Sequence, residues 1–533
     1  MSRRWVIAVC GVLTVAVLGY LTNGNIRYQV GVGRVSGSSV AETFSHRPIT
    51  FRLFSAAQAW LPELVSRLTG PQGSWWRVWA FETGFRLIAA ALAAGAAWLL
   101  WAGLRRCWGT QAWPYGVAAY AALMFTAPAT GEPDWMAALL AVAAIGAGLL
   151  WRPGVGGLVG GALLALAALV KISTLPVAVA ALVVLWVIDR RRGWIALVAA
   201  TVSGLAAVGL VWWLAPYEIG WLLDIRALQP DPWTPDAVLE AGNYVMNLAA
   251  RWPTVALLPA FFVGARRTEV VTAAVGLALT GFAFVFQGQY FIYHSMGFVV
   301  LSALLAVRTI LRSRAALRWP LLGLCAWTLV LFVLPAEWRL AHPVGLSLVT
   351  GAWMLGLAVW QWIATHRPQA LSGARADGWA ALLVVLAMVA TQTPFSAESL
   401  TLNTADRTVW ARGVALQSDL DSARQVHAVI GAGTQVAYLT FGDSTYVLGN
   451  PTHCRYPSQL FLQRPDADQS VSAATRQESL ACLTDPAARW LIWDRDWLHR
   501  KGAPEDLIGV IDRTWACDSA QVIGGYTLCP RKN

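Results

Sequence analysis

Three carboxylates lie beside apolar stretches of sequence, where a charged side chain is costly and therefore informative. Glu42 is in the polar segment after the first apolar run, and Glu132 and Asp134 are in the segment GEPDW immediately before a later apolar run. A carboxylate in such a place acts as a general base towards a substrate hydroxyl or binds a metal ion. For Asp134 a structural interpretation stays open, because an acidic residue in the first turn of a helix interacts favourably with the helix dipole.

Basic residues that suit a phosphate group are found in the same regions. Arg27, His46 and Arg47 follow the first apolar run, and a guanidinium fork matches phosphate geometry. Contact with anionic headgroups, or a general preference for arginine in a chain with only three lysines, explains these arginines equally well. Lys171 lies between two apolar runs, where it either binds a phosphate or extends to the membrane surface.

A further polar group lies in the segment VFQGQYFIYH, at another junction between apolar runs. It contains Gln287, Gln289, Tyr293 and His294, whose amides, phenol and imidazole suit a sugar or a pyrophosphate. An interfacial aromatic belt explains the tyrosine but not the amides or the imidazole. We therefore take these four as candidate residues for binding a donor substrate.

Composition places the chain among membrane proteins. It is 57% hydrophobic and 13% charged, with a mean hydropathy of +0.52, and its charged fraction is about half that of soluble domains. The net charge of +11 comes from arginines in alternate connections between apolar runs, as expected of cytoplasmic loops. Nucleic acid is therefore excluded as a partner.

The apolar runs predict a multi-span α-helical protein of the cell membrane, with about thirteen transmembrane helices. With the arginine-rich connections in the cytoplasm, the N-terminus is cytoplasmic and the C-terminus extracytoplasmic. No small-residue cleavage site follows the first run, which we expect to stay as an uncleaved helix. The predicted spans are 5–22, 84–104, 112–128, 134–150, 155–170, 172–188, 195–215, 253–265, 270–286, 295–309, 319–335, 344–363 and 378–392.

Two domains are expected. Residues 1–392 form the transmembrane module, whose long external loops are 22–83 and 216–252, and residues 393–533 form an extracytoplasmic soluble α/β domain. An amphipathic helix is predicted over 51–68. In the terminal domain we expect a helix that ends at Gly431 and strands at VAYLTF, RWLIWD and YTLC.

Cysteine positions agree with this orientation. Four of the seven cysteines are in the terminal domain: Cys454, Cys482, Cys517 and Cys529. Since disulfides persist in oxidising compartments, two bridges are expected there, and their pairing stays open.

Together these segments resemble the C-type glycosyltransferase (GT-C) superfamily, in the branch related to protein O-mannosyltransferases and lipid A aminoarabinose transferases. FSHRPITF resembles that branch's YFDHPPL, and QGQYFIYH is similar to a QGKGxxYH stretch of bacterial members. GEPDWMAALLAVAA resembles TDxPLxxFxxLAL, with Asp134 or Glu132 at the acidic position. LALAALVKIST resembles GLxxLxKYT, with Lys171 at the lysine.

The resemblance implies a glycosyltransferase that takes a sugar from a polyprenyl-phosphate donor on the extracytoplasmic face and inverts the anomeric carbon. The bias towards arginine, alanine and tryptophan indicates a bacterial origin. Its partners are membrane lipids, the polyprenyl-phosphate-linked sugar, and a glycan, lipid or protein acceptor of the cell envelope. No cofactor besides the donor is implied, and a divalent metal stays undetermined. Arg27, Arg47, Lys171 and His294 are the candidates for stabilising the leaving phosphate, and the three carboxylates are the candidates for the base.

One departure from the family pattern affects the expected chemistry. Members carry an acidic residue soon after the first helix, in a pattern like DExxY, whereas this chain has GNIRYQ, with Asn25 at that position. An amide cannot act as a general base at neutral pH. Glu42 takes over this role, or Glu132 or Asp134 supplies it, or the protein is a noncatalytic relative that binds a lipid carrier. A transporter is disfavoured, because the centres of the predicted spans are almost purely apolar.

Overall fold

The structure is a computed structural model in which two compact units can be distinguished. The first comprises residues 1–20, 86–206 and 231–410, and the second comprises residues 21–85, 207–230 and 411–533. The structure describes residues 2–18, 24–36, 43, 47–71, 73–125, 130–228, 233–288, 292–313, 317–335, 338, 341–366, 376–389, 409–457, 471–495 and 498–532.

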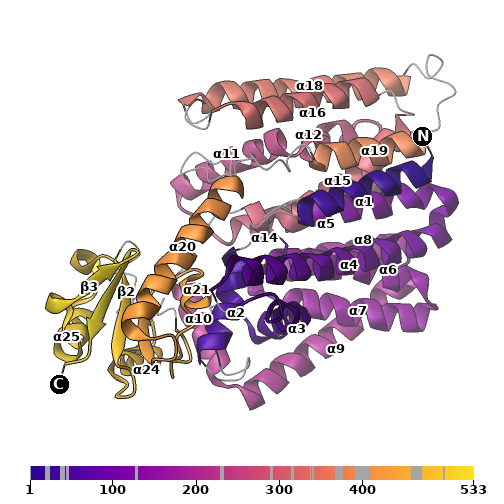
Figure 1. Cartoon of the computed structure of the whole chain (residues 1–533). Helices are drawn as coiled ribbons and strands as arrows, with labels where there is room; N and C mark the ends of the chain where they lie inside the picture. Colours follow the sequence, from indigo (N-terminus) through magenta and orange to yellow (C-terminus); the bar gives the residue numbers. More distant parts are fainter. Residues whose placement is uncertain are drawn as a thin grey trace. The chain divides into compact units, whose positions relative to one another are not determined.

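The first unit is a bundle of helices that run alongside one another (Figure 1). Its helices are α1 (Arg3–Leu18), most of α4 (Trp75–Trp108), α5 (Trp113–Met124), α6 (Pro133–Leu150), α7 (Pro153–Leu169), α8 (Leu175–Ile188), most of α9 (Arg190–Leu214), α11 (Pro235–Arg251), α12 (Pro253–Ala256), α13 (Leu258–Phe262), α14 (Arg267–Val285), α15 (Met296–Arg312), α16 (Arg318–Val333), α18 (Pro343–His366) and α19 (Ala376–Val389).

Six helical segments among the described residues are long and apolar enough to cross a membrane. They are Trp75–Met124, which joins α4 and α5, and Pro133–Leu150, Arg190–Leu214, Arg267–Val285, Tyr293–Arg312 and Val344–His366. A bent pair of helices would make a seventh, and four shorter apolar helices lie beside them. The chain is therefore a multi-pass membrane protein.

The six or seven apolar spans do not confirm the expected count of about thirteen. Helices of the first unit coincide with most of the predicted spans, but α11 lies within the predicted external loop 216–252, and the chain differs clearly at 253–265. There the chain forms two short helices, α12 and α13, with Pro259 in the first turn of α13. The segment Pro253–Phe262 also meets the preceding helix at an angle of 103°. Proline lacks a backbone N–H and clashes with the preceding turn, so it favours a helix start over a helix interior.

Small residues allow the helices around α6 to approach closely. A Cβ added at Gly156 of α7 would lie 2.5 Å from the carbonyl oxygen of Gly148 in α6, and one at Gly161 would lie 2.4 Å from the carbonyl oxygen of Ala196 in α9. Backbones in such contact are typical of helix pairs in membranes. The resulting cluster of α6, α7 and α8, with α14 packed on α8, positions the helix ends that carry the candidate site.

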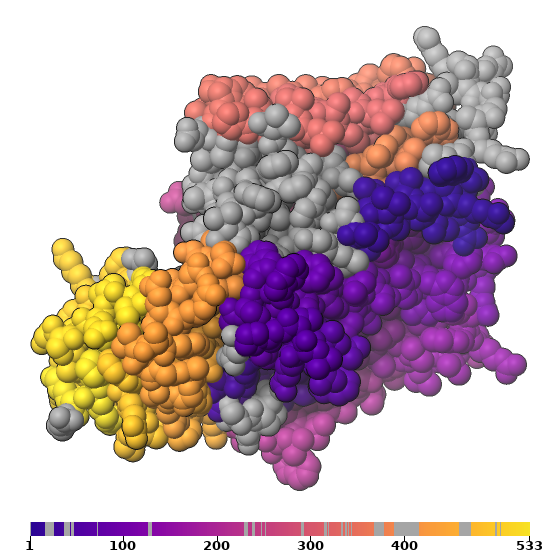
Figure 2. Space-filling view, viewed as in Figure 1, coloured from indigo at the N-terminus to yellow at the C-terminus, as the bar shows by residue number. Residues whose placement is uncertain are grey.

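Outer helices of this unit present apolar side chains to their surroundings. In α18, Val344, Leu348 and Leu355 are 70%, 68% and 67% exposed, and α18 lies at the surface in the space-filling view (Figure 2). A helix that stays apolar on its outer face suits a hydrocarbon solvent.

The second unit combines helices with a small sheet. Its elements are α2 (Gly24–Ser36), α3 (Ile49–Ser66), the first turns of α4, α10 (Tyr217–Ala227), most of α20 (Val409–Ile430), β1 (Val436–Leu439), α21 (Ser444–Leu448), α24 (Ala473–Thr484), β2 (Trp490–Asp494), α25 (Glu505–Thr514), β3 (Gln521–Ile523) and β4 (Tyr526–Pro530). The described strands form one sheet in the order β1-β2-β4-β3, in which β1 and β2 are parallel and the other pairs antiparallel.

Alternate residues of the strands pack on opposite faces of this sheet. Val436 and Tyr438 join a core with α20 and the N-terminal helices, whereas Ala437 and Leu439 join a second core with α24 and α25. This period of two explains why VAYL is apolar at every position, since both faces of the strand are buried.

The structure pairs the four cysteines that sequence left open. Cys454 is bonded to Cys482, and Cys517 is bonded to Cys529. The second bridge joins β4 to the short 3-10 turn before β3.

Candidate functional site

Lys171 lies in the short connection between α7 and α8. Its backbone is extended (φ −162°, ψ 142°), and the 3-10 turn Ile172–Thr174 follows before α8 begins. The buried hydroxyl of Thr174 donates to the carbonyl oxygens of Ala167 and Lys171, at 2.7 and 2.6 Å. These bonds close the hairpin and hold the lysine at one end of the helix pair.

The Lys171 ammonium group is surrounded by side chains from three other segments. Its Nζ lies 3.4 Å from Oδ2 of Asp134 and 3.4 Å from Nε2 of His294, and it donates to Oε1 of Gln287. Gln287 Nε2 donates to the other carboxylate oxygen of Asp134, at 3.1 Å. We call these four residues the Lys171 cluster.

Each member of the cluster lies at the end of a helix. Asp134 is in the first turn of α6, Gln287 follows the end of α14, and His294 is in the 3-10 turn Ile292–Ser295 that leads into α15. The indole of Trp135 donates to the carbonyl oxygen of Leu123, at 2.8 Å, which anchors the start of α6. Helix packing thus brings together residues that are far apart in the sequence.

Burial makes this cluster electrostatically strong. The residues Glu132, Asp134, Gln287 and His294 are 2% to 7% exposed, while the Lys171 side chain is 18% exposed. A charge shielded from water interacts strongly with its neighbours. The Lys171 ammonium group is the most solvent-accessible member of the cluster. An anion that binds to it meets a positive charge whose position is fixed by buried partners.

Glu132 directly precedes α6, where its carbonyl oxygen accepts from the N–H of Met136, at 3.0 Å. It is 3% exposed and precedes Asp134 by two residues in the sequence. Tyr293 packs edge-on against His294, with ring centroids 4.4 Å apart. Within the described parts of the chain, no group of three or more His, Cys, Asp or Glu side chains is arranged to hold a metal ion.

Arg27 belongs to the second unit, where two carboxylates bind it. Its Nε donates to Asp443 at 2.8 Å and its NH1 donates to Glu82 at 2.9 Å. Burial alone lowers the pKa of the Arg27 guanidinium, but the charges of Asp443 and Glu82 outweigh burial and hold the pKa above its ordinary value. Sequence reasoning missed both partners, although Glu82 is a lone carboxylate in an apolar helix and could have been noticed for that reason.

A second buried ion pair in this unit joins α3 to α10. Arg52 NH1 lies 3.1 Å from both carboxylate oxygens of Glu218, which also accepts from the backbone N–H of Ile49 at 2.8 Å. Burial raises the pKa of the Glu218 carboxyl, although Arg52 opposes the shift. The remaining predicted residue nearby, Arg47, is half-buried, and its carbonyl oxygen accepts from Arg52 at 2.7 Å.

Three predicted site residues cannot be placed. Glu42, His46 and Gln289 lie outside the described residues. Of the others, the structure brings Asp134, Lys171, Gln287 and His294 into contact. Tyr293 is next to His294 in the sequence, and Glu132 is two residues before Asp134.

Two solved structures share the fold over almost the whole chain. They are ArnT from Cupriavidus metallidurans in the apo state, with 14% identity and a TM-score of 0.52, and ArnT from the same organism bound to undecaprenyl phosphate, with 13% identity and a TM-score of 0.54. Each match covers 98% of this chain and 97% of that chain. No protein-family model and no curated protein matches the sequence. ArnT is a lipid A aminoarabinose transferase of the GT-C fold, so the resemblance drawn from the sequence is confirmed at the level of the fold.

Proposed function

We propose that this protein is a membrane glycosyltransferase of the GT-C type, which moves a sugar from a polyprenyl-phosphate donor to a cell-envelope acceptor on the extracytoplasmic face. The Lys171 cluster carries the proposal, because three segments that are distant in the sequence converge on one lysine. The fold shared with ArnT, one structure of which holds undecaprenyl phosphate, supports the choice of donor.

Lys171 and His294 are the proposed phosphate-binding groups. As the bond from the anomeric carbon to the phosphate oxygen breaks, negative charge develops on the phosphate, and a preorganised cation stabilises that charge. Asp134 and Gln287 are positioning residues in this proposal. Their contacts with the ammonium hold it in one place, so little reorganisation is needed when the phosphate departs.

Glu132 is the proposed general base among the described carboxylates. Asp134 accepts hydrogen bonds from Lys171 and Gln287 on its two carboxylate oxygens, so its proposed role is to position these two side chains. In the proposed step the acceptor hydroxyl oxygen attacks the anomeric carbon, its proton passes to the carboxylate, and the polyprenyl phosphate leaves with the bonding electrons. Attack opposite the leaving group inverts the anomeric carbon. Glu42 is the alternative base.

Arg27 has a structural role in this proposal, since Glu82 and Asp443 neutralise it within the second unit. Arg47, His46, Gln289 and Tyr293 remain candidates for contacts with the donor.

A noncatalytic protein that binds the lipid carrier is the second candidate. The observation in its favour is Asn25, which replaces the acid that the family carries after its first helix. Both functions predict binding of a polyprenyl phosphate, but only the first predicts transfer.

The test is sugar transfer in membranes supplied with a panel of undecaprenyl-phosphate-linked sugars and envelope acceptors. Wild type is compared with Glu132→Gln and Glu42→Gln, and Glu505→Gln, at an exposed position of α25, is the matched control. We expect Glu132→Gln to abolish transfer while undecaprenyl phosphate still binds, and the control to keep full activity. Carrier binding without transfer by wild type would support the noncatalytic function instead. Loss of transfer in Glu42→Gln alone would assign the base to that residue.

A further inference from the structure

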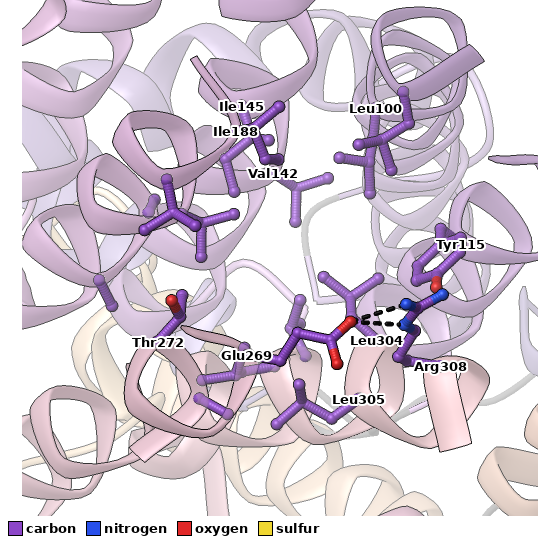
Figure 3. Close-up of a pocket in the computed structure, with 18 of the residues that line it drawn as sticks. Leu100, Tyr115, Val142, Ile145, Ile188, Glu269, Thr272, Leu304, Leu305 and Arg308 are labelled. Carbon is purple, nitrogen blue, oxygen red and sulfur yellow. Dashed lines mark hydrogen bonds and ion pairs between the residues drawn. The ribbon is translucent and has the colours of Figure 1, made fainter. Parts of the chain in front are cut away.

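The helix bundle contains an open cavity of about 500 Å³ whose lining includes none of the four residues of the Lys171 cluster. Its walls come from α4, α5, α6, α8, α14 and α15, and they are mostly Ala, Val, Leu and Ile side chains such as Val142, Ile145 and Leu304 (Figure 3). A cavity of this size is within the range of pockets that hold small ligands, roughly 300–1,000 Å³. Its lining suits a hydrocarbon chain.

Polar groups gather at one end of this cavity. Arg266, Glu269 and Arg308 line it there, and Glu269 is the single carboxylate among the described lining residues. Arg308 donates to Glu269 from Nε at 3.1 Å and from NH2 at 2.7 Å, as Figure 3 shows. Arg312 donates to the other oxygen of Glu269, at 2.8 Å. Two guanidinium groups therefore share one carboxylate, and Arg266 adds a third cation to the lining, which leaves this end of the cavity positively charged.

The charged end lies far from the Lys171 cluster along the helices. Glu269 is in the first turn of α14, whereas Gln287 follows its last turn. Thr280, another lining residue, is three turns beyond Glu269, which is roughly 16 Å at ~1.5 Å per residue. The cavity is thus elongated, with a cationic end and an apolar body, and the cationic end is the one that the arginine pattern predicts to be cytoplasmic.

Exposure at the cationic end suits a ligand headgroup. The Arg308 side chain is 42% exposed, although Glu269 already binds two of its nitrogens. A guanidinium group has five N–H donors, so Arg308 can bind a phosphate oxygen while it keeps its contact with Glu269. Basic pockets between membrane helices on the cytoplasmic side characteristically bind anionic headgroups.

We propose that this cavity binds an anionic phospholipid of the bilayer, with the headgroup phosphate on Arg266 and Arg308 and one acyl chain between α6, α8 and α15. The charge of the arginines selects an anion, and the apolar body selects a hydrocarbon chain. The headgroup site does not depend on the proposed transfer reaction, because Glu269 lies at the other end of α14 from Gln287 and the test measures binding alone.

The test is photolabelling of the full-length protein in nanodiscs made of phosphatidylcholine. The probe is phosphatidylglycerol that carries a diazirine in its acyl chain, and labelled peptides are identified by mass spectrometry. We expect labels on the cavity-lining segments of α6, α8 and α15, and displacement by unlabelled phosphatidylglycerol but not by added phosphatidylcholine.

Charge variants test the headgroup assignment. Each arginine near a lipid headgroup changes affinity roughly fivefold, so Arg266→Gln with Arg308→Gln should weaken labelling roughly 25-fold. Arg106→Gln is the matched control, since Arg106 is exposed near the end of α4 and does not line the cavity. Equal labelling in all three proteins would overturn the assignment.

A cavity-filling variant keeps the proposal testable where the arginine variants fail to fold. Ala141→Phe adds a ring to a lining position of α6 without a change of charge, and it should remove labels from the cavity while labels on lipid-facing α18 persist. Labels on outward-facing residues alone would mean that only surface lipid is detected, which overturns the proposal. Displacement of the probe by undecaprenyl phosphate at much lower concentration than by phosphatidylglycerol would also overturn it, by assigning the cavity to the carrier lipid.

Discussion

Substitution of Lys171 separates the role of the cluster in stability from its role in chemistry. Lys171→Met removes the ammonium and leaves Asp134, whose side chain is 3% exposed, without its ion-pair partner. At the observed separation of 3.4 Å, the attraction is ~5 kcal/mol for an effective dielectric constant of 20. Two effects offset part of this attraction. The lysine is partly exposed, so water screens its charge, and the methionine variant no longer has a lysine charge to bury. The expected destabilisation is therefore ~3 kcal/mol, at the lower end of the range for a broken buried pair.

The double variant Lys171→Met with Asp134→Asn should recover most of this loss, because no unpaired charge then remains. We expect its free energy of unfolding to be within ~1 kcal/mol of that of wild type, since a neutral replacement of a buried pair is often close to neutral. Sugar transfer should not recover. Loss of one group that stabilises developing charge costs ~100-fold or more in rate, and both variants lack it.

Unfolding by SDS titration in mixed micelles gives the stabilities, and the transfer assay gives the rates. Lys501→Met, at an exposed lysine of the second unit, is the matched control and should change neither. If the losses in free energy of unfolding caused by Lys171→Met alone and Asp134→Asn alone add up to the loss in the double variant, the two side chains are not energetically coupled. That result would refute the reasoning from their geometry.

Three further predictions concern the remaining features. Glu132→Gln should leave the equilibrium constant of unfolding and the affinity for undecaprenyl phosphate within twofold of wild type, while sugar transfer is lost. Equal loss of binding and transfer would make Glu132 a donor-binding residue instead. Burial raises the pKa of the Glu218 carboxyl, so the folded state binds a proton at this group more readily than the unfolded chain does. The free energy of unfolding of wild type, relative to that of Glu218→Gln, should therefore increase as pH falls from neutral towards ~4.3. A decrease over the same pH range in unfolding titrations would contradict this. Removal of the Cys454–Cys482 bridge, whose cysteines are 28 residues apart in the sequence, should lower the free energy of unfolding by ~3.5 kcal/mol. Peptide mapping without reduction should recover these two cysteines as one linked pair.

Much of the fold could be predicted because the relevant signals are local in sequence. The run from Pro133 to Leu150 is apolar over the length of a membrane crossing, and it forms α6. Gly431 ends α20 with a φ of 81°, a conformation that glycine adopts without steric cost. The break at Pro259 was missed, because hydropathy averages over a window and proline weighs little in such an average.

The candidate site was predicted as a set of residues but not as an arrangement. Lys171 and His294 were each chosen because a polar group beside an apolar run is costly and needs a purpose. That argument treats one segment at a time, so it assigned no contact among Lys171, Asp134 and Gln287. It also assigned Arg27 to a phosphate, because the sequence does not reveal that Asp443 lies 2.8 Å from it.

The local sequence specifies that this chain is a membrane protein, where most of its helices run, and which polar residues are candidates for a functional site. Each of these follows from the transfer cost of individual side chains between water and hydrocarbon, which is a property of the local sequence. Tertiary structure alone decided which residues meet: Lys171 with Asp134, Arg52 with Glu218, and Cys517 with Cys529. Such contacts depend on how helices and strands pack, and packing is set by the fit between surfaces that are distant along the chain.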